Sequence, residues 1–224
     1  MAYYEIEIKS LLGDKDSAEA LKRRMQALDR ACVRTAVNVQ LNHYFKDGDM
    51  AVLFEKTKKF FDPAARERFQ KILGKGSEFS VRTRQKDDMV LLVIKASVDD
   101  GTSANAIARI EFEEPVPLTL VALDALLEEA KFSYQAKWSR AREEFTYRGI
   151  TVCLDCNAGY GYLAEFEKVI EDDRMLNSVR AKLVALMAEL GVAELPQDRL
   201  ERMFAYYNEH WPEYYGTDKT FTIV

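Results

Sequence analysis

The chain has 224 residues, of which 48% are hydrophobic and 31% charged, and its net charge is −5. This length suits one large domain or two small ones, and the apolar share is enough for a core, which excludes a disordered chain. The negative balance argues against general binding to nucleic acids or membranes, although it leaves room for a locally basic cavity. No apolar run approaches the ~20 residues that span a membrane, and no secretory signal is recognisable.

Cysteine and histidine chemistry has little support in the sequence. The three cysteines, Cys32, Cys153 and Cys156, fit a reducing cytosol better than a disulfide framework, so a cytoplasmic location is expected. Cys153 and Cys156 have CxxC spacing, but no second pair follows, and a structural role is favoured over a metal or redox site. His43 and His210 sit in no motif, which disfavours a zinc site and a Ser/His/Asp triad.

Hydrophobic periodicity predicts a chain that mixes strands and helices. In chain order, strands are predicted at 5–9, 33–45, 78–85, 89–96, 106–114, 137–147, 150–155 and 162–170, and helices at 18–30, 63–74, 118–132, 175–190 and from 196 onward. Asp16 followed by Glu19 has the spacing of a capping box for the first helix. The insert 47–77 is expected to be mostly helical. Most strands are joined by hairpins, so the sheet is predicted to be largely antiparallel.

Charged residues recur at every second position in most of these strands. They are Glu5, Glu7 and Lys9; Arg82 and Arg84; Lys95; Arg109, Glu111 and Glu113; Arg140 and Arg142; Asp155; and Glu165 and Glu167. Because successive side chains of a strand point to opposite faces, one face of the sheet is charged and the other apolar. Two structures remain open, an open sheet whose charged face lies in water and a barrel with a charged lumen. A solvated face usually mixes in Ser, Thr, Gln and Asn, which favours the barrel.

The charges themselves indicate a class of chemistry. Charges of both signs in a lumen are costly unless they pair with each other or with ions, so the barrel predicts a charged ligand and metal ions. Carboxylates clustered without His or Cys are hard oxygen ligands, suited to Mg²⁺ or Mn²⁺. Arg and Lys suit phosphate oxygens. Together they are what phosphoryl transfer needs, and they predict metal-dependent polyphosphate chemistry.

The order and spacing of these residues resemble the CYTH superfamily, the triphosphate tunnel metalloenzymes. Glu5-x-Glu7-x-Lys9 is similar to the ExExK signature of that family, and the later basic and acidic pairs follow in the family's order over residues 3–170. The resemblance implies an α+β fold with an antiparallel, eight-stranded closed β-barrel, a charged lumen and helices packed outside. It also implies a single domain over residues 1–224, with a helical segment at about 175–224, and a triphosphate-containing small molecule threaded through the tunnel.

The resemblance further implies a role for each charged residue. The implied metal ligands, for Mg²⁺ or Mn²⁺, are Glu5, Glu7, Glu111, Glu113, Glu165 and Glu167. The implied phosphate contacts are Lys9, Arg82, Arg84, Lys95, Arg109, Arg140 and Arg142, with Lys137 as an alternative member of the second basic pair. The implied catalytic residues are Glu5, Glu7, Glu165, Glu167 and Asp155, of which Asp155 would orient a basic group or a metal-bound water.

Three functions remain open at this point. The first is a triphosphate hydrolase acting on tripolyphosphate, a nucleoside triphosphate or thiamine triphosphate. The second is a class IV adenylate cyclase that makes cyclic AMP and pyrophosphate from ATP. The third is a non-catalytic module that binds a polyphosphate or nucleotide. The complete acid pairs, Glu111 with Glu113 and Glu165 with Glu167, resemble the triphosphatase branch and favour the hydrolase.

The aromatic tail also keeps several interpretations. Residues 211–224 are predicted to be less regular than the helix that begins at Pro196. Aromatic residues at helical spacing usually pack into a core, and this is the favoured interpretation. Alternatively, the tail covers one tunnel mouth, with Lys219 reaching the substrate, or holds a homodimer together.

Overall fold

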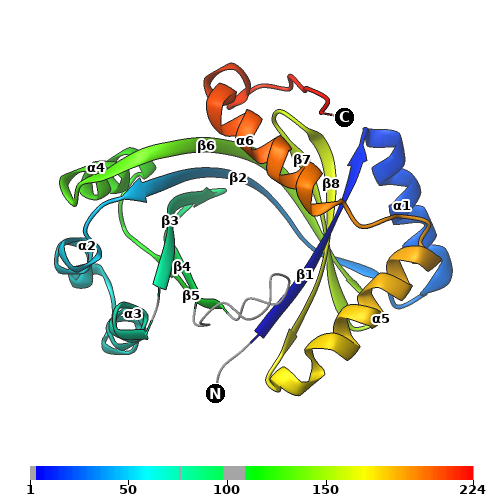
Figure 1. Ribbon diagram of the computed structural model, residues 1–224, viewed down its shortest axis with the longest axis horizontal. Helices are drawn as coiled ribbons and strands as arrows, with labels where there is room; N and C mark the ends of the chain where they lie inside the picture. Colours follow the sequence, from blue (N-terminus) through cyan, green and yellow to red (C-terminus); the bar gives the residue numbers. More distant parts are fainter. Residues whose placement is uncertain (1–3, 76, 98–108, 224) are drawn as a thin grey trace. The chain divides into compact units, whose positions relative to one another are not determined.

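The computed structural model describes residues 4–75, 77–97 and 109–223 (Figure 1). The strands of this described part are β1 (Tyr4–Gly13), β2 (Val33–Asp47), β3 (Ser77–Lys86), β4 (Met89–Ser97), β5 (Arg109–Pro115), β6 (Phe132–Tyr147), β7 (Ile150–Asn157) and β8 (Gly161–Ile170). Its α-helices are α1 (Lys15–Leu28), α2 (Met50–Thr57), α3 (Pro63–Lys75), α4 (Leu120–Glu129), α5 (Leu176–Glu189) and α6 (Gln197–Tyr214). Two 3-10 helices, η1 (Lys58–Phe60) and η2 (Asp173–Met175), complete them.

The predicted α+β class and the eight antiparallel strands are confirmed. The strands are hydrogen-bonded in the order β1-β8-β7-β6-β2-β3-β4-β5. Among the described residues this order does not return from β5 to β1, so closure of the sheet into a barrel stays a prediction. The start of the fifth predicted strand, at 106–108, lies outside the described residues.

The chain forms two compact units. Unit 1 contains residues 1–39 and 139–224, and unit 2 contains residues 40–138. The long strands β2 and β6 each contribute to both units. The predicted organisation as a single domain stays a prediction.

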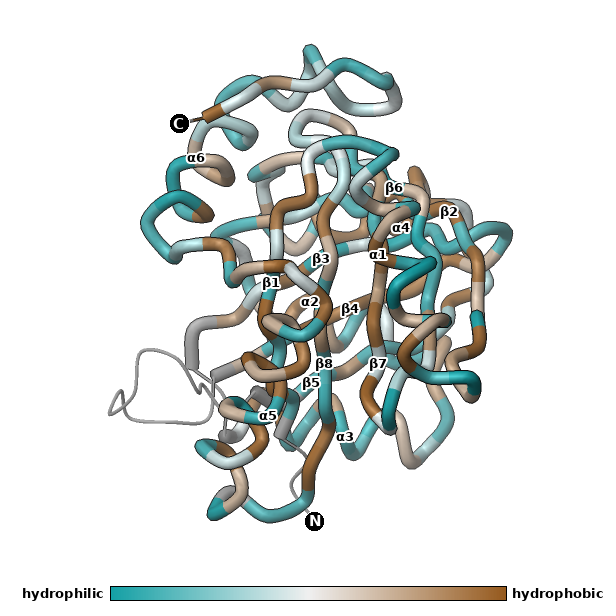
Figure 2. The backbone as a smooth tube through the Cα atoms, turned by 90° about the vertical axis from the view of Figure 1, so that its right-hand side faces the viewer, coloured by the Kyte–Doolittle hydropathy of each residue, from teal (hydrophilic) through white to brown (hydrophobic). Residues whose placement is uncertain are grey.

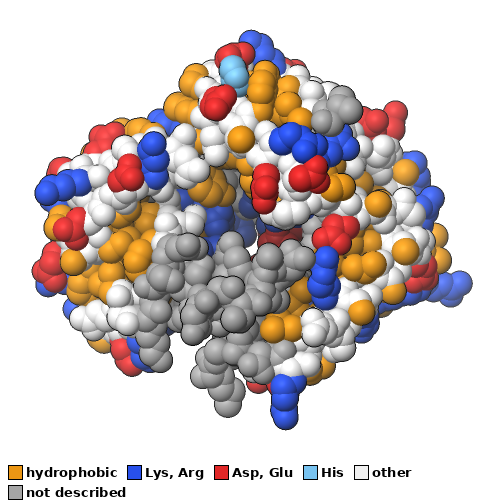
Figure 3. Space-filling view, in the orientation of Figure 1, with side chains coloured by type: hydrophobic (Ala, Val, Ile, Leu, Met, Phe, Trp, Pro, Cys, Tyr) orange, Lys and Arg blue, Asp and Glu red, His pale blue; other side chains and the backbone are white. Residues whose placement is uncertain are grey.

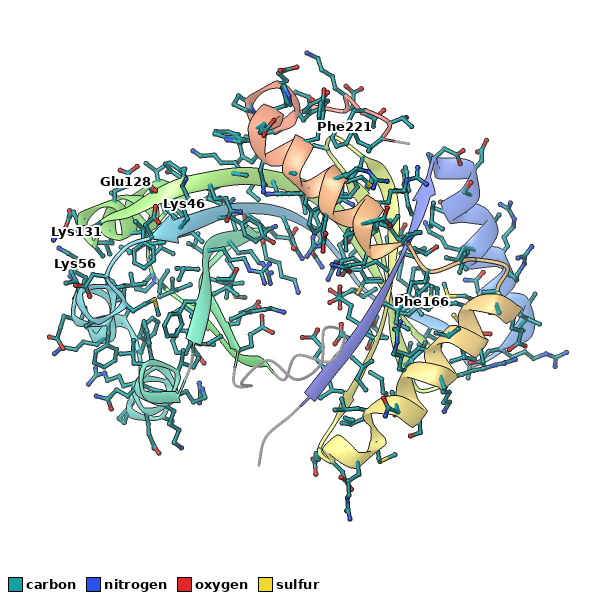
Figure 4. The ribbon with its side chains drawn as sticks, in the orientation of Figure 1. Lys46, Lys56, Glu128, Lys131, Phe166 and Phe221 are labelled. Carbon is teal, nitrogen blue, oxygen red and sulfur yellow. The ribbon has the colours of Figure 1, made fainter. Side chains whose placement is uncertain are left out.

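Unit 1 has an apolar core between its strands and two helices. In Figure 1, α1 and α5 lie on the same side of β1 and β8. Ile6 and Ile8 of β1 pack in this core with Leu21 and Met25 of α1. Phe166 of β8, labelled in Figure 4, belongs to the same core. The charged residues of β1 and β8 alternate with these apolar ones and therefore occupy the opposite face of the strands.

The last helix and the tail pack over the turn between β7 and β8. Gly159 in this turn forms a parallel bridge with Thr220, and its N–H donates to the Lys219 carbonyl at 2.9 Å. Phe221, which lies beside α6 in Figure 4, contacts the ring of Tyr214 with centroids 5.2 Å apart. Basic and acidic side chains lie together on the outer surface of α6 (Figure 3). The ring contact between Phe221 and Tyr214 agrees with the favoured interpretation of this segment, in which its aromatic residues pack into a core.

Unit 2 has a second apolar core, covered by α2, α3 and α4. Phe69 of α3 meets Phe112 of β5 with ring centroids 5.0 Å apart, and Ile94 and Leu123 are fully buried beside them. Figure 2 shows β4 mostly in brown, the colour of apolar residues. Its lysine, Lys95, interrupts this pattern and is only half-buried.

Several predicted boundaries of helices and strands are wrong. The first helix begins at Lys15 because Asp14, not Asp16, caps it and accepts a hydrogen bond from the Ser17 N–H at 2.8 Å. The predicted helix 118–132 ends at Glu129, and β6 begins at Phe132, five residues earlier than predicted.

The predicted irregular tail also starts too early. Helix α6 continues to Tyr214, although it contains Pro212. The Tyr215 N–H donates to the Trp211 carbonyl at 2.8 Å, and Tyr214 packs against Tyr207. These contacts hold the last turn of the helix despite the proline.

Candidate functional site

The facing strands β1 and β8 bring four predicted site residues together in unit 1. In the strand register, Glu7 lies directly opposite Glu167, and Lys9 lies directly opposite Glu165. The Lys9 ammonium contacts the Glu7 carboxylate and lies 3.5 Å from Oε1 of Glu165. Acids and a base therefore alternate on one sheet face, as the sequence predicts.

Strands β6 and β7 add two arginines and a buried aspartate to this face. Asp155 is fully buried and accepts hydrogen bonds from two guanidinium groups. Arg142 donates from Nε to Oδ1 and from Nη2 to Oδ2, both at 2.6 Å, and Arg140 donates from Nη1 to Oδ2 at 2.8 Å. Arg142 also donates to Glu165, which links the two halves of the network.

The charges of the network shift the pKa values of Glu165 and Arg142. Burial by itself would raise the pKa of Glu165, but the positive charges of Lys9, Arg142 and Arg140 outweigh it and hold that pKa well below its ordinary value. Burial by itself would lower the pKa of Arg142, but its hydrogen bonds to Asp155 and its attraction to Glu165 raise it above the ordinary value. Both shifts favour the charged forms of Glu165 and Arg142 at neutral pH.

The acidic part of unit 1 fits a divalent metal ion that substrate oxygens complete. Like charges placed directly opposite on neighbouring strands, as in Glu7 and Glu167, destabilise a sheet. Mg²⁺ commonly binds through one or two carboxylates together with substrate phosphates and water. Within the described ranges no three His, Cys, Asp or Glu side chains group closely enough to hold a metal alone. The donor set therefore fits a metal shared with a phosphate chain and not a closed structural site.

Unit 2 carries its own ion pairs on the charged face. Arg84 donates from Nη1 to both carboxylate oxygens of Glu113, at 3.0 and 2.9 Å, and from Nε to the Asn42 side-chain oxygen at 2.8 Å. Lys95 lies 3.2 Å from Glu111 on the neighbouring strand. Acids outnumber bases among the predicted residues of unit 1, whereas bases outnumber acids in unit 2.

Arg82 differs from Arg84 in its surroundings. It is 9% exposed, and its Nη1 donates to the Tyr44 hydroxyl at 2.7 Å. Its Nε is buried, and no acceptor among the described residues lies within hydrogen-bond distance of it. A buried guanidinium nitrogen without an acceptor is costly, unless an anion reaches it.

A buried polar network lies behind these arginines, on the other face of the sheet. Asp124 of α4 is 3% exposed, and its carboxylate meets Nδ1 of His43 at 2.7 Å. It also accepts hydrogen bonds from the hydroxyls of Thr83 at 2.5 Å and Tyr134 at 2.9 Å. Because Thr83 stands between Arg82 and Arg84, this network fixes the segment of β3 that presents the two arginines.

Four other predicted residues take no part in the site contacts described above. Glu5 is exposed near the start of β1, opposite Val169. The Lys137 ammonium lies 4.2 Å from the centroid of the Tyr134 ring, so the basic pair that meets Asp155 is Arg140 with Arg142. Lys219 is exposed in the tail. The side chain of Arg109 lies outside the described residues.

Sequence reasoning missed the polar residues of β2. Gln40, Asn42 and Tyr44 stand at every second position on β2, and the register places Asn42 opposite Arg84 and Tyr44 opposite Arg82. Their alternation was a readable signal, but uncharged side chains did not stand out among the charged strands. Of the three free cysteines, Cys32 and Cys153 are buried and Cys156 is exposed, and burial raises the pKa of the Cys153 thiol to about 12. A structural role for the CxxC pair stays a prediction.

Residues 68–199 match the sequence model of the CYTH domain. This range covers more than half of the chain and includes every predicted site residue from Arg82 to Glu167, whereas Glu5, Glu7, Lys9 and Lys219 lie outside it. No curated protein sequence matches the chain. No helix within the described ranges is both long and apolar enough to cross a membrane.

Solved structures with the same fold cover almost the whole chain. A protein from Pyrococcus horikoshii aligns over 91% of this chain and 99% of its own, with a TM-score of 0.61 and 17% identity. A candidate adenylate cyclase from Vibrio parahaemolyticus aligns over 92% and 99%, with a TM-score of 0.59 and 17% identity. A candidate adenylyl cyclase from Hippeastrum, described as having a dominant triphosphatase activity, aligns over 90% and 96%, with a TM-score of 0.52 and 16% identity.

Proposed function

The chain belongs to the CYTH domain family, and we propose that it is a divalent-metal-dependent triphosphate hydrolase. The proposed substrates are tripolyphosphate, a nucleoside triphosphate or thiamine triphosphate. The observation that carries this proposal is the facing pair of Glu7 and Glu167 beside the linked charges of Lys9, Glu165 and Arg142. Carboxylates for a metal and bases for phosphate share one sheet face.

The proposed roles follow from the contacts. Glu7 and Glu167 hold Mg²⁺ or Mn²⁺, and the remaining acids proposed for this task are Glu5, Glu111, Glu113 and Glu165. The proposed phosphate contacts are Lys9, Arg82, Arg84, Lys95, Arg140 and Arg142. Asp155 positions Arg140 and Arg142 by accepting hydrogen bonds from both. When bound, the metal ion supplies charge neutralisation and Lewis acidity to the phosphate chain.

The proposed reaction is attack of water on the terminal phosphorus. A bond forms from the water oxygen to phosphorus while the bridging P–O bond breaks, and the products are orthophosphate, the shortened phosphate chain and a proton released to solvent. Positive charges on rigid strands stabilise the negative charge that collects on the transferring oxygens. Arg142 is suited to this because Asp155 and Glu165 fix its guanidinium group before substrate binds.

Adenylate cyclase activity is the second candidate, favoured by the description of the Vibrio protein. In that reaction the ribose 3′-oxygen attacks the α-phosphorus and pyrophosphate leaves. The complete acid pairs and the triphosphatase activity described for the Hippeastrum protein support the hydrolase instead.

One product analysis tests both candidates. Tripolyphosphate, ATP, GTP and thiamine triphosphate are each incubated with Mg²⁺ or Mn²⁺, and the products are resolved by phosphorus NMR. The hydrolase produces orthophosphate only when metal is present. Cyclic AMP with pyrophosphate from ATP would replace this proposal by the cyclase. Phosphate release that survives EDTA, or the absence of turnover with every substrate, would contradict it.

A further inference from the structure

Two aromatic rings lie on the polar side of unit 2, outside its apolar core. Tyr44 of β2 stands opposite Arg82 of β3, and its ring meets the indole of Trp138 on β6 edge-on, with centroids 6.1 Å apart and an angle of 60° between the rings. Both rings are half-buried, and neither belongs to the cluster of apolar residues around Phe69 and Phe112. An indole is the largest apolar side chain, so its position outside a core invites a functional explanation.

Tyr44 connects the indole to the proposed phosphate contact. Its hydroxyl accepts a hydrogen bond from Nη1 of Arg82 at 2.7 Å, and the guanidinium carbon of Arg82 lies 5.1 Å from the centre of its ring. The guanidinium group and the indole thus both lie against the Tyr44 ring. The Nε of Arg82 is buried and has no hydrogen-bond acceptor among the described residues. If a phosphate of the ligand binds there, Tyr44 connects that phosphate contact to the indole of Trp138.

We propose that Trp138 stacks on a flat ring carried by the substrate. Resting on the proposed function, this inference makes the substrate a ring-bearing triphosphate, a nucleoside triphosphate or thiamine triphosphate, in preference to bare tripolyphosphate. Every such ring has a π-face, and stacking on an aromatic side chain recognises it with little dependence on its hydrogen-bonding groups. Tyr44 acts as a positioning residue that orients both Trp138 and Arg82.

Fluorescence tests the stacking without turnover. The chain has two tryptophans, so Trp211→Phe leaves Trp138 as the single indole. Trp211 of α6 packs against Tyr215, the residue that follows the helix, and phenylalanine keeps an aromatic ring at position 211. In this variant, two ring-bearing ligands are expected to quench the emission of Trp138, whereas tripolyphosphate is not. The first is the β,γ-methylene analogue of ATP. The second is thiamine triphosphate, whose quench is recorded by stopped flow before turnover. The ligand with the stronger quench identifies the preferred ring.

Kinetics of three variants separates ring contacts from phosphate contacts. For Trp138→Leu, the ratio of KM for the ring-bearing substrate to KM for tripolyphosphate is expected to rise about 5- to 150-fold, the loss of one stacked ring. Trp138→Phe keeps a ring and is expected to restore most of this ratio. Tyr44→Phe removes only the hydroxyl that holds Arg82, so both KM values are expected to rise together.

Each outcome decides the inference separately from the proposed function. An equal quench by tripolyphosphate, no quench by any ligand, or an unchanged KM ratio in Trp138→Leu would overturn the stacking, even where orthophosphate is still released. A Trp138→Leu chain with a lower urea midpoint and an unchanged ratio would make the ring pair purely structural. No orthophosphate from any triphosphate would overturn the hydrolase, while the fluorescence would still report whether ring-bearing ligands bind.

Discussion

Arg142 and Asp155 are strand partners on β6 and β7 and form a two-point ion pair, with both N–O distances at 2.6 Å. Asp155 is fully buried, and Arg142 is nearly so. Removing one partner of such a pair leaves an uncompensated buried charge, which is far more costly than losing an exposed pair. The same ion pair therefore stabilises unit 1 and positions the charged side chains on its sheet face.

Asp155→Asn is expected to destabilise the chain and to lower activity together. The amide keeps the shape of the carboxylate but cannot neutralise two arginines, so the free energy of unfolding is expected to fall by about 3 kcal/mol. Urea unfolding measures the loss. Asp198→Asn is the matched control, because Asp198 pairs with Arg202 on an exposed surface and its loss is expected to leave the urea midpoint in place. Equal midpoints for the two variants would contradict a special role for Asp155.

Glu167→Gln is expected to change stability and metal dependence in opposite directions. Without metal, removing one of two facing carboxylates relieves repulsion with Glu7, so the free energy of unfolding is expected to rise by about 0.5 kcal/mol. The Mg²⁺ concentration for half-maximal phosphate release is expected to rise at least about 10-fold, because a ligand is lost.

The control for this experiment is Glu189→Gln at the end of α5. Glu189 forms a partly exposed ion pair with Arg148, and neither residue is a predicted site residue. The metal dependence of the Glu189→Gln chain is expected to match that of the unaltered chain. A Glu167→Gln chain that is destabilised and keeps its Mg²⁺ requirement would argue that the carboxylate pairs with a base instead of a metal.

Much of unit 1 could be predicted because its information is local. Alternation in residues 5–9 and 162–170 determines which side chains face the core, since a strand has a period of two. The contact between Arg142 and Asp155 could not be read in the same way. It depends on the register between β6 and β7, and that register is fixed by the turn at Arg148 and Gly149 and by packing, not by any one strand.

Two features of unit 2, a short helix and a buried polar network, were not predicted from the sequence. Helix α2 went unpredicted as a separate element, although Asp49 caps it by accepting from two backbone N–H groups. His43 was set aside because it sits in no motif, and its partner, Asp124, lies 81 residues away on α4. A buried polar network of this kind forms only when elements distant in the sequence come into contact, so no local sequence pattern predicts it.

Asp124→Asn is expected to weaken the chain in a pH-dependent way. Burial by itself would raise the pKa of Asp124, but hydrogen bonds from His43, Thr83 and Tyr134 outweigh it and lower that pKa in the folded chain. The ionised carboxylate therefore contributes stability above the ordinary Asp pKa of about 3.9, and the contribution is lost as the pH falls through the lower, folded value.

The measurement for this network is urea unfolding at several pH values. At pH 7 the Asp124→Asn chain is expected to be less stable by about 2 kcal/mol, the scale of hydrogen bonds to a charged group, and the difference is expected to shrink below about pH 4. Glu128→Gln, on the exposed side of the same helix (Figure 4), is the control and is expected to show no such convergence. A difference that stays constant with pH would mean that the carboxylate is not ionised in the folded chain.

Gly159→Ala is expected to detach the tail from the turn between β7 and β8. Gly159 has a φ of +93°, and an added Cβ would lie 2.6 Å from Cδ2 of Tyr207. Gly149 has a φ of +74° with no atom within 4 Å of an added Cβ, so Gly149→Ala isolates the backbone cost of about 1–2 kcal/mol. Gly159→Ala is expected to exceed that loss by about 1–3 kcal/mol, the cost of overpacking against a buried ring.

Urea unfolding compares the two variants, and limited proteolysis followed by mass spectrometry reports whether residues 216–223 are released first. If both alanine variants lose the same stability and their tails are cleaved at the same rate, then the Tyr207 ring moves to accommodate the methyl group. Its contact with residue 159 would then not hold the tail in place.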